Sequence, residues 1–174
     1  MTITVQTLRT PLTAQDIEQL SEVLIDCVHG GASVSFMAPL PREKAHAFWQ
    51  RVADSAARGE RQVLVARDAQ GVIVGTVQLV TDLPDNQPHR ADVSKMLVHR
   101  RARRQGIAEA LLRALDEAAR AKGRTTLMLD TVTGGDAERL YARHGWQRVG
   151  EIPLFALMPD GAPCSTTFFY RHLH

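Results

Sequence analysis

Apolar residues recur along this chain at helical and strand spacings, and the pattern predicts which segments form each element. Spacings of three and four residues predict two helices in the N-terminal third, at 13–29 and 41–59. Thr13 followed by Asp16 is an approximate capping box, and Pro41 suits the first position of a helix. Short apolar or alternating runs predict strands at 2–9, 61–67 and 72–81.

The second half begins with a strand at 92–98, an arginine-rich turn, and a helix that opens at Gly106. A strand at 125–131, a short helix between Gly135 and Gly145, and two closing strands at 146–157 and 164–173 follow. Because a helix connects the strands at 92–98 and 125–131, we expect a right-handed unit in which these strands are parallel. The whole order predicts an α/β (α+β) fold, with a mixed sheet and helices on both faces.

The connection between the first two helices, Ala32–Leu40, is more apolar than an exposed loop usually is. Val34, Phe36 and Met37 are its large apolar members. These side chains either fold back on the core or line a ligand cleft, and the sequence leaves both readings open.

Length and composition indicate a folded protein with a single domain. A chain of 174 residues, 44% of them apolar, is long enough for one well-cored domain and too short for two comfortable ones. We therefore expect a single domain over residues 1–174. The N-terminus lacks the apolar core of a signal peptide, and no apolar run approaches the roughly 20 residues of a membrane span. A cytoplasmic protein with no membrane partner is the expectation.

The formal net charge is only +2, but five arginines gather near the strand at 92–98: Arg90, Arg100, Arg101, Arg103 and Arg104. This cluster lacks interleaved aromatic residues and a nucleic-acid motif, so we do not expect nucleic acid as a partner. Cys27 and Cys164 match no metal spacing, and we expect no metal site. Cys27 falls on the apolar face of the first helix, where we expect it to be buried.

The turn from Arg103 to Ala108 has the features of an anion site. The first amides of the following helix have no intrahelical partner, and the helix dipole and nearby guanidinium groups add positive potential. Gly106 and Ala108 are small, so a pyrophosphate has room to approach the backbone. The turn matches neither the three-glycine dinucleotide pattern nor a P-loop. Its other reading is a solvated basic turn that caps a core helix.

This R-x-x-G-x-A turn after a strand resembles motif A of the GCN5-related N-acetyltransferases, the GNAT family. The segment Ala137–Trp146 resembles a second signature of that family, A-x-x-L-Y-x-x-x-G-F, with Trp in place of Phe. The resemblance implies the GNAT fold: a mixed, mostly antiparallel sheet of about seven strands, four flanking helices, and a splayed parallel pair at 92–98 and 125–131. It also implies an acyltransferase that moves an acetyl group from acetyl-CoA to an amine.

The resemblance assigns cofactor contacts to two segments. The backbone of Met96, Leu97 and Val98 would pair with the pantetheine arm of acetyl-CoA. The diphosphate would lie on the turn formed by Arg103, Arg104, Gln105, Gly106, Ile107 and Ala108. Tyr141 matches a family tyrosine that lies near the thioester sulfur, where a phenol can protonate the leaving thiolate. Its other reading is a core aromatic on an apolar helix face.

Two aspartates are candidates for the catalytic base. Asp92 begins one strand of the splayed pair and Asp130 ends the other, so both could flank the gap. An ordinary aspartate, with a pKa of about 3.9, is a poor base unless burial or repulsion raises that pKa or a water relays the proton. Alternatively, Asp130 caps a loop amide and Asp92 pairs with Arg90 or Lys95. The sequence does not choose between the two.

The acceptor is expected near the connection between the first two helices, at His29, Gly30, Gly31 and Ser33. The strings VHGGASVSFM, PDG and STTFFYRHL resemble the tabtoxin-resistance acetyltransferase subgroup. That resemblance implies a small-molecule amine as partner, such as a β-lactam amino-acid toxin or an antibiotic-like metabolite. A protein or peptide amine is an alternative acceptor, a catalytically silent acyl-CoA sensor is an alternative function, and His29 is also readable as a satisfied loop histidine.

The last strand carries an apolar run, Phe168, Phe169 and Tyr170. Such a run in the C-terminal hairpin could serve a homodimer, and the sequence leaves the oligomeric state open.

Overall fold

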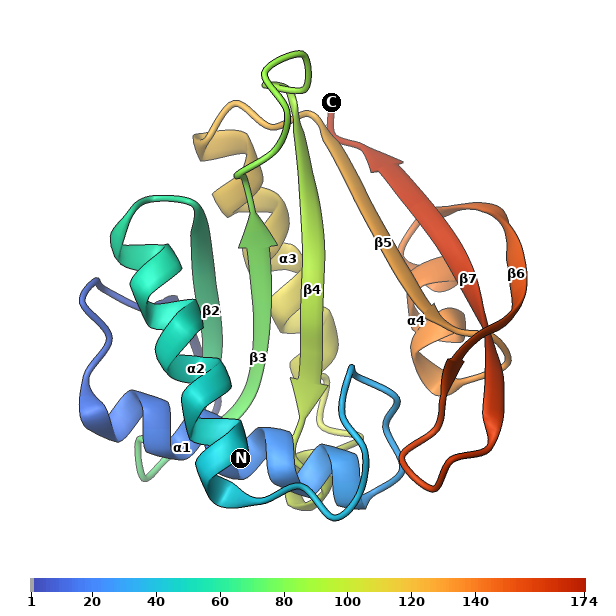
Figure 1. The fold of residues 1–174 in the computed structure, drawn as a ribbon. Coiled ribbons are helices and arrows are strands. Elements are labelled where there is room, and N and C mark those ends of the chain that lie inside the picture. Colours follow the sequence, from blue (N-terminus) through green and yellow to red (C-terminus); the bar gives the residue numbers. More distant parts are fainter. Residues whose placement is uncertain (1) are drawn as a thin grey trace.

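Seven strands form one sheet in the computed structural model, which describes residues 2–174 (Figure 1). The strands are β1 (Thr4–Thr7), β2 (Arg61–Arg67), β3 (Ile73–Val80), β4 (Arg90–Val98), β5 (Thr126–Val132), β6 (Gln147–Leu157) and β7 (Pro163–His172). The α-helices are α1 (Ala14–His29), α2 (Arg42–Ala57), α3 (Ile107–Ala121) and α4 (Asp136–Arg143). Every element expected from the sequence is present, with small shifts at its ends. A short 3₁₀ helix, Arg100–Ala102, is added in the arginine-rich turn.

The strands lie in the order β1-β2-β3-β4-β5-β7-β6, and only β4 and β5 are parallel neighbours. Helix α3 connects them, as the sequence predicts. They pair at only three positions, the last being Asp92 opposite Met128. Beyond that point β4 stays paired with β3 and β5 with β7, so the sheet opens between them (Figure 1).

The helices cover both faces of the sheet, with α1 and α2 on one face and α3 and α4 on the other (Figure 1). Alternate residues of β2 serve the two cores: Val63 packs in the α1/α2 core and Leu64 in the α3 core. This alternation follows from the two-residue period of a strand. Burying such a side chain stabilises the fold by about 1.5–3 kcal/mol. No helix within residues 2–174 combines the length and apolar character needed to cross a bilayer.

The start of α1 confirms the predicted capping box. The Thr13 hydroxyl accepts a hydrogen bond from the Asp16 amide at 3.1 Å, and the Asp16 carboxylate accepts one from the Thr13 amide at 3.0 Å. Burial alone would raise the pKa of Asp16, but hydrogen bonds from Thr13 and Arg67 hold that pKa below its usual value. The start of α2 differs slightly from the prediction, because Pro41 is the N-cap and the helix begins at Arg42.

The exposed apolar surface lies on β6, at the edge of the sheet, and not on the run singled out in β7. Phe169 is only 1% exposed because it packs in the α3 core against Tyr141. Leu154, in contrast, is 79% exposed, and Val149 is 65% exposed. Phe169 of the β7 run is therefore a core residue, since α4 packs over the face from which its side chain projects.

Candidate active site

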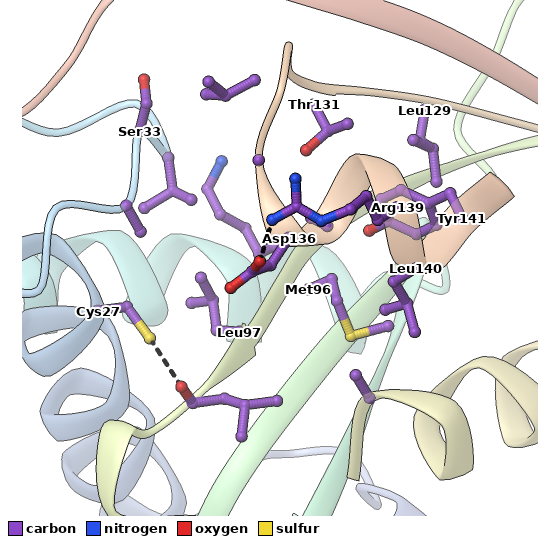
Figure 2. A pocket seen from close by; sticks show the side chains of 18 of the residues that line it. Cys27, Ser33, Met96, Leu97, Leu129, Thr131, Asp136, Arg139, Leu140 and Tyr141 are labelled. Atoms are coloured by element: carbon purple, nitrogen blue, oxygen red, sulfur yellow. Dashed lines mark hydrogen bonds and ion pairs between the residues drawn. The ribbon is translucent and has the colours of Figure 1, made fainter. Parts of the chain in front are cut away.

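A cleft of about 940 Å³ opens where β4 and β5 diverge. From Val93 onward, β4 has a strand partner on the β3 side only, so its other edge leaves backbone groups that need a partner. Met96, Leu97 and Val98 line the cleft along this edge, and Figure 2 shows Met96 and Leu97 there. The β4 segment that the family resemblance assigns to the pantetheine arm is thus an open strand edge.

The same segment of β4 contains a bulge. Thr76 of β3 pairs with Leu97, whereas Gln78 pairs with Ser94, so two β4 residues lie opposite Val77. One of the two, Lys95, has a left-handed backbone with φ of 53°. A bulge re-aims side chains and frees backbone groups from the ladder, and here it does so inside the cleft.

The far end of the cleft is the N-terminus of α3. Gly106 is its N-cap, with φ of 73° and no side-chain cap, so the first amides of the helix are available to a ligand. A Cβ built on Gly106 would meet no atom within 4 Å, so the positive φ, and not crowding, is what favours glycine there. Arg103, Arg104, Ile107 and Ala108 also line the cleft. This donor set fits a diphosphate, because it combines free amides, a helix dipole and guanidinium groups.

Tyr141 lies on α4 and is both a core aromatic and a cleft residue. Its ring packs against Trp146, with centroids 5.6 Å apart, and is only 4% exposed, yet it lines the cleft (Figure 2). Burial raises the pKa of the Tyr141 phenol, and the negative charge of Asp130 raises it further. The hydroxyl is therefore protonated at neutral pH and able to donate a proton.

The two candidate bases occupy different places. Asp130 lines the cleft on β5, and its carboxylate lies 2.7 Å from the Thr166 hydroxyl, which donates a hydrogen bond to it. Asp92 is not among the residues that line the cleft. It sits where β4 and β5 are still paired, and its carboxylate accepts a hydrogen bond from Arg90. The structure brings Asp130, and not Asp92, into one cleft with Tyr141.

The opposite end of the cleft is covered by the connection between α1 and α2. Gly30, Gly31 and Ser33 line it there. The Ser33 hydroxyl donates to the Leu157 carbonyl at 2.9 Å, and the Ala38 amide donates to the Pro159 carbonyl at 3.0 Å. These bonds tie the connection to the β6–β7 hairpin.

Both readings of the apolar connection hold at once. Phe36 packs against the α1/α2 core, and Val34 packs there while also lining the cleft. Met37 stays 44% exposed.

His29 is not among the residues that line the cleft. Its Nε2 accepts a hydrogen bond from the Leu40 amide at 3.0 Å, so the imidazole joins the two ends of the Gly30–Leu40 segment. This is the satisfied loop histidine that the sequence left as an alternative. His29 therefore holds the shape of the segment that covers the cleft and does not itself face the cleft.

His29→Ala is expected to lower the free energy of unfolding by about 1 kcal/mol, because it leaves the Leu40 amide without its acceptor. Amide hydrogen exchange should become faster at Leu40 and its neighbours, measured beside urea denaturation. His46→Ala, on the exposed face of α2, is the matched control and should change neither quantity. Unchanged exchange at Leu40 in His29→Ala would contradict this role.

Sequence reasoning missed two polar residues of the cleft. Thr166 on β7 holds Asp130, and Lys95 projects from the bulge. The sequence signal for Lys95 is a charge directly before the apolar run Met96–Val98.

Cys27, expected to be buried, is 1% exposed, and burial raises the pKa of its thiol to about 11. Within residues 2–174, no group of three or more His, Cys, Asp or Glu side chains is arranged to hold a metal ion.

Comparison with known proteins agrees with this geometry. A family model described as an acetyltransferase (GNAT) domain matches residues 59–148. An uncharacterized N-acetyltransferase in the hisH-hisA intergenic region of Azospirillum brasilense is 35% identical over 130 residues, which cover 74% of each chain. An N-acetyltransferase structure from Staphylococcus aureus Mu50 superposes with a TM-score of 0.81 and 18% identity over 100% of both chains. A phosphinothricin acetyltransferase from Sinorhizobium meliloti, solved with acetyl-CoA, also gives 0.81, at 20% identity, over 99% of this chain and 89% of its own.

The chain therefore belongs to the GNAT acetyltransferase family. Its seven-stranded mixed sheet, with the parallel β4 and β5 pair and four α-helices, confirms the fold expected from the sequence. It is an N-acetyltransferase that depends on acetyl-CoA.

Proposed function

We propose that this enzyme acetylates the amine of a small polar molecule, and that one domain carries the whole reaction. The observation that supports this most is the form of the cleft. It runs from the free amides of α3 along the open edge of β4, and it is covered at its other end by the Gly30–Leu40 segment. One end suits the diphosphate of acetyl-CoA, and the covered end suits a small acceptor.

Bound acetyl-CoA supplies an activated acetyl thioester. The backbone of Met96, Leu97 and Val98 would hold the pantetheine arm, because that edge of β4 lacks a strand partner. An amide in this run would also stabilise the developing oxyanion, a role that contributes about 3 kcal/mol in other enzymes. The amides and guanidinium groups from Arg103 to Ala108 would hold the diphosphate.

Two side chains would move the protons. Asp130 would take a proton from the acceptor ammonium, directly or through a water, because it is the carboxylate that shares the cleft with Tyr141 and is held by Thr166. Tyr141 would protonate the leaving thiolate, since its phenol stays protonated at neutral pH. Asp92 receives no catalytic role, since Arg90 binds it outside the cleft.

Coverage of the acceptor end favours a small molecule over a protein or peptide amine. Hydrogen bonds from Ser33 and Ala38 fasten the Gly30–Leu40 segment to the β6–β7 hairpin, which supports a bordered site for a small acceptor. The fold alone does not choose, because both a phosphinothricin acetyltransferase and a ribosomal-protein-alanine N-acetyltransferase share it. We place the enzyme with the tabtoxin-resistance subgroup, and propose a toxin or antibiotic-like metabolite as acceptor, on the sequence strings around Gly30 and Thr166.

Thiol release from acetyl-CoA, measured across a panel of amino acids, β-lactams and aminoglycosides, tests this function. We expect turnover with at least one small amine and none with unstructured peptides that carry lysine or a free N-terminus. Turnover confined to peptides would support the protein-amine alternative. Tight binding of acetyl-CoA without thiol release from any amine would support a silent acyl-CoA sensor.

A further inference from the structure

Lys95 is a partly buried cation at the covered end of the cleft. Its Nζ donates a hydrogen bond to the Ser35 hydroxyl at 3.1 Å and lies 5.7 Å from the centroid of the Phe48 ring. These two contacts come from the connection after α1 and from α2, so the ammonium group is held on the side of β4 that faces α2. The contacts define its position without neutralising its charge.

Among residues 2–174, no carboxylate forms an ion pair with Lys95. Arg139, which also lines the cleft, is paired with Asp136, whereas Arg103 and Arg104 lie in the turn before α3. Figure 2 shows the Arg139 pair with Asp136. A partly buried charge without a counter-ion costs free energy, and this cost is removed when an anion binds beside it.

The bulge in β4 decides where the Lys95 side chain lies. The left-handed φ of 53° at Lys95 belongs to the bulge. The bulge turns this side chain into the cleft, whereas a regular strand would continue the ladder with β3. The bulge therefore places a cation in the cleft, on the side bordered by Ser35.

Asp130 provides the opposite charge in the same cleft. Burial lowers the pKa of Lys95, and the nearby Asp130 carboxylate acts against that lowering. Both side chains line the cleft, and within residues 2–174 no ion pair joins them. A ligand with one positive and one negative group would satisfy both.

We propose that the acceptor is zwitterionic: Lys95 binds an acidic group that lies a few bonds from the amine, while Asp130 faces the ammonium. This inference rests on the proposed function and narrows its substrate class to amino-acid-like molecules. Polyamines and aminoglycosides are disfavoured, because their additional positive charges would lie beside Lys95. The role of Lys95 is specificity, exerted through the position and affinity of the acceptor.

The test compares acceptors that differ only in the acidic group, such as an amino acid and its carboxamide. Wild-type enzyme should prefer the acidic member about ten- to hundredfold in kcat/KM, mostly through KM. Lys95→Gln should remove this preference by raising the KM for the acidic member toward that for the carboxamide. Lys95→Arg keeps the charge and should restore part of the preference. Lys44→Gln, on the exposed face of α2, is the control.

Equal turnover of acid and carboxamide by the wild type would overturn the inference while leaving the proposed function intact. An equal loss of kcat for both members in Lys95→Gln would also overturn it, because it would make Lys95 a proton-transfer group. Calorimetric binding of the same pairs, with coenzyme A present, decides the matter even if no amine is acetylated. Tighter binding of the acidic member by wild type than by Lys95→Gln is expected, and equal binding would contradict the proposal.

Discussion

Asp130→Asn is expected to lower kcat about a hundredfold or more, while the KM for acetyl-CoA changes by no more than about twofold. The asparagine oxygen still accepts the hydrogen bond from Thr166, so the geometry of β5 and β7 is kept. An amide cannot take a proton from the acceptor, however, so the base is lost while the fold around it is kept. Steady-state kinetics with each substrate varied in turn measures both quantities.

Asp92→Asn is the matched control, because Asp92 is the other candidate from the sequence and lies outside the cleft with Arg90. It should leave kcat close to that of the wild type. Loss of kcat in Asp92→Asn with little change in Asp130→Asn would reverse the assignment. A parallel loss of kcat and of acetyl-CoA affinity in Asp130→Asn would show that Asp130 is not a base.

Tyr141→Phe is expected to lower kcat about a hundredfold with little change in stability. The ring that packs against Trp146 and Phe169 remains, so only the proton donor is lost. Thermal unfolding and thiol release measured on the same preparation separate these two effects. Tyr170→Phe, which removes a hydroxyl from a β7 tyrosine outside the cleft, is the control and should keep wild-type turnover.

The pH profile gives the Tyr141 assignment a second readout. Burial, with the charge of Asp130, raises the pKa of this phenol. The phenol therefore keeps its proton at pH values up to and above its usual pKa of about 10. A group whose pKa is raised keeps its acid form as the pH increases. Wild-type kcat should therefore show no loss assignable to Tyr141 below about pH 10. Wild-type turnover in Tyr141→Phe would contradict the acid role.

Much of the fold was predictable because hydrophobic periodicity specifies each element. The stripe of Ile17, Leu20 and Leu24 on α1 is buried as expected, and the apolar run of β5 lies in the interior of the sheet. The two parallel strands followed from the helix between them. The turn before α3 was visible as well, since an uncapped glycine at a helix start has a direct chemical meaning.

The remainder depends on tertiary geometry that a single sequence does not express. Asp92 and Asp130 looked equivalent, and only the position at which β4 and β5 separate distinguishes them. The sequence does not reveal the bulge at Lys95, because one extra residue in a strand leaves the composition of that strand almost unchanged. Phe169 looked suited to an interface, but neighbouring strands and α4 cover it.

Amide hydrogen exchange with and without acetyl-CoA tests the central claim most directly, namely that the gap between β4 and β5 is the acetyl-CoA site. Binding should slow exchange in two separate segments, Met96–Val98 on the open edge of β4 and Gly106–Glu109 at the start of α3. The exposed edge strand β6 should stay unchanged outside the residues that line the cleft. Protection that misses both segments while acetyl-CoA is bound would place the cofactor elsewhere and contradict the account.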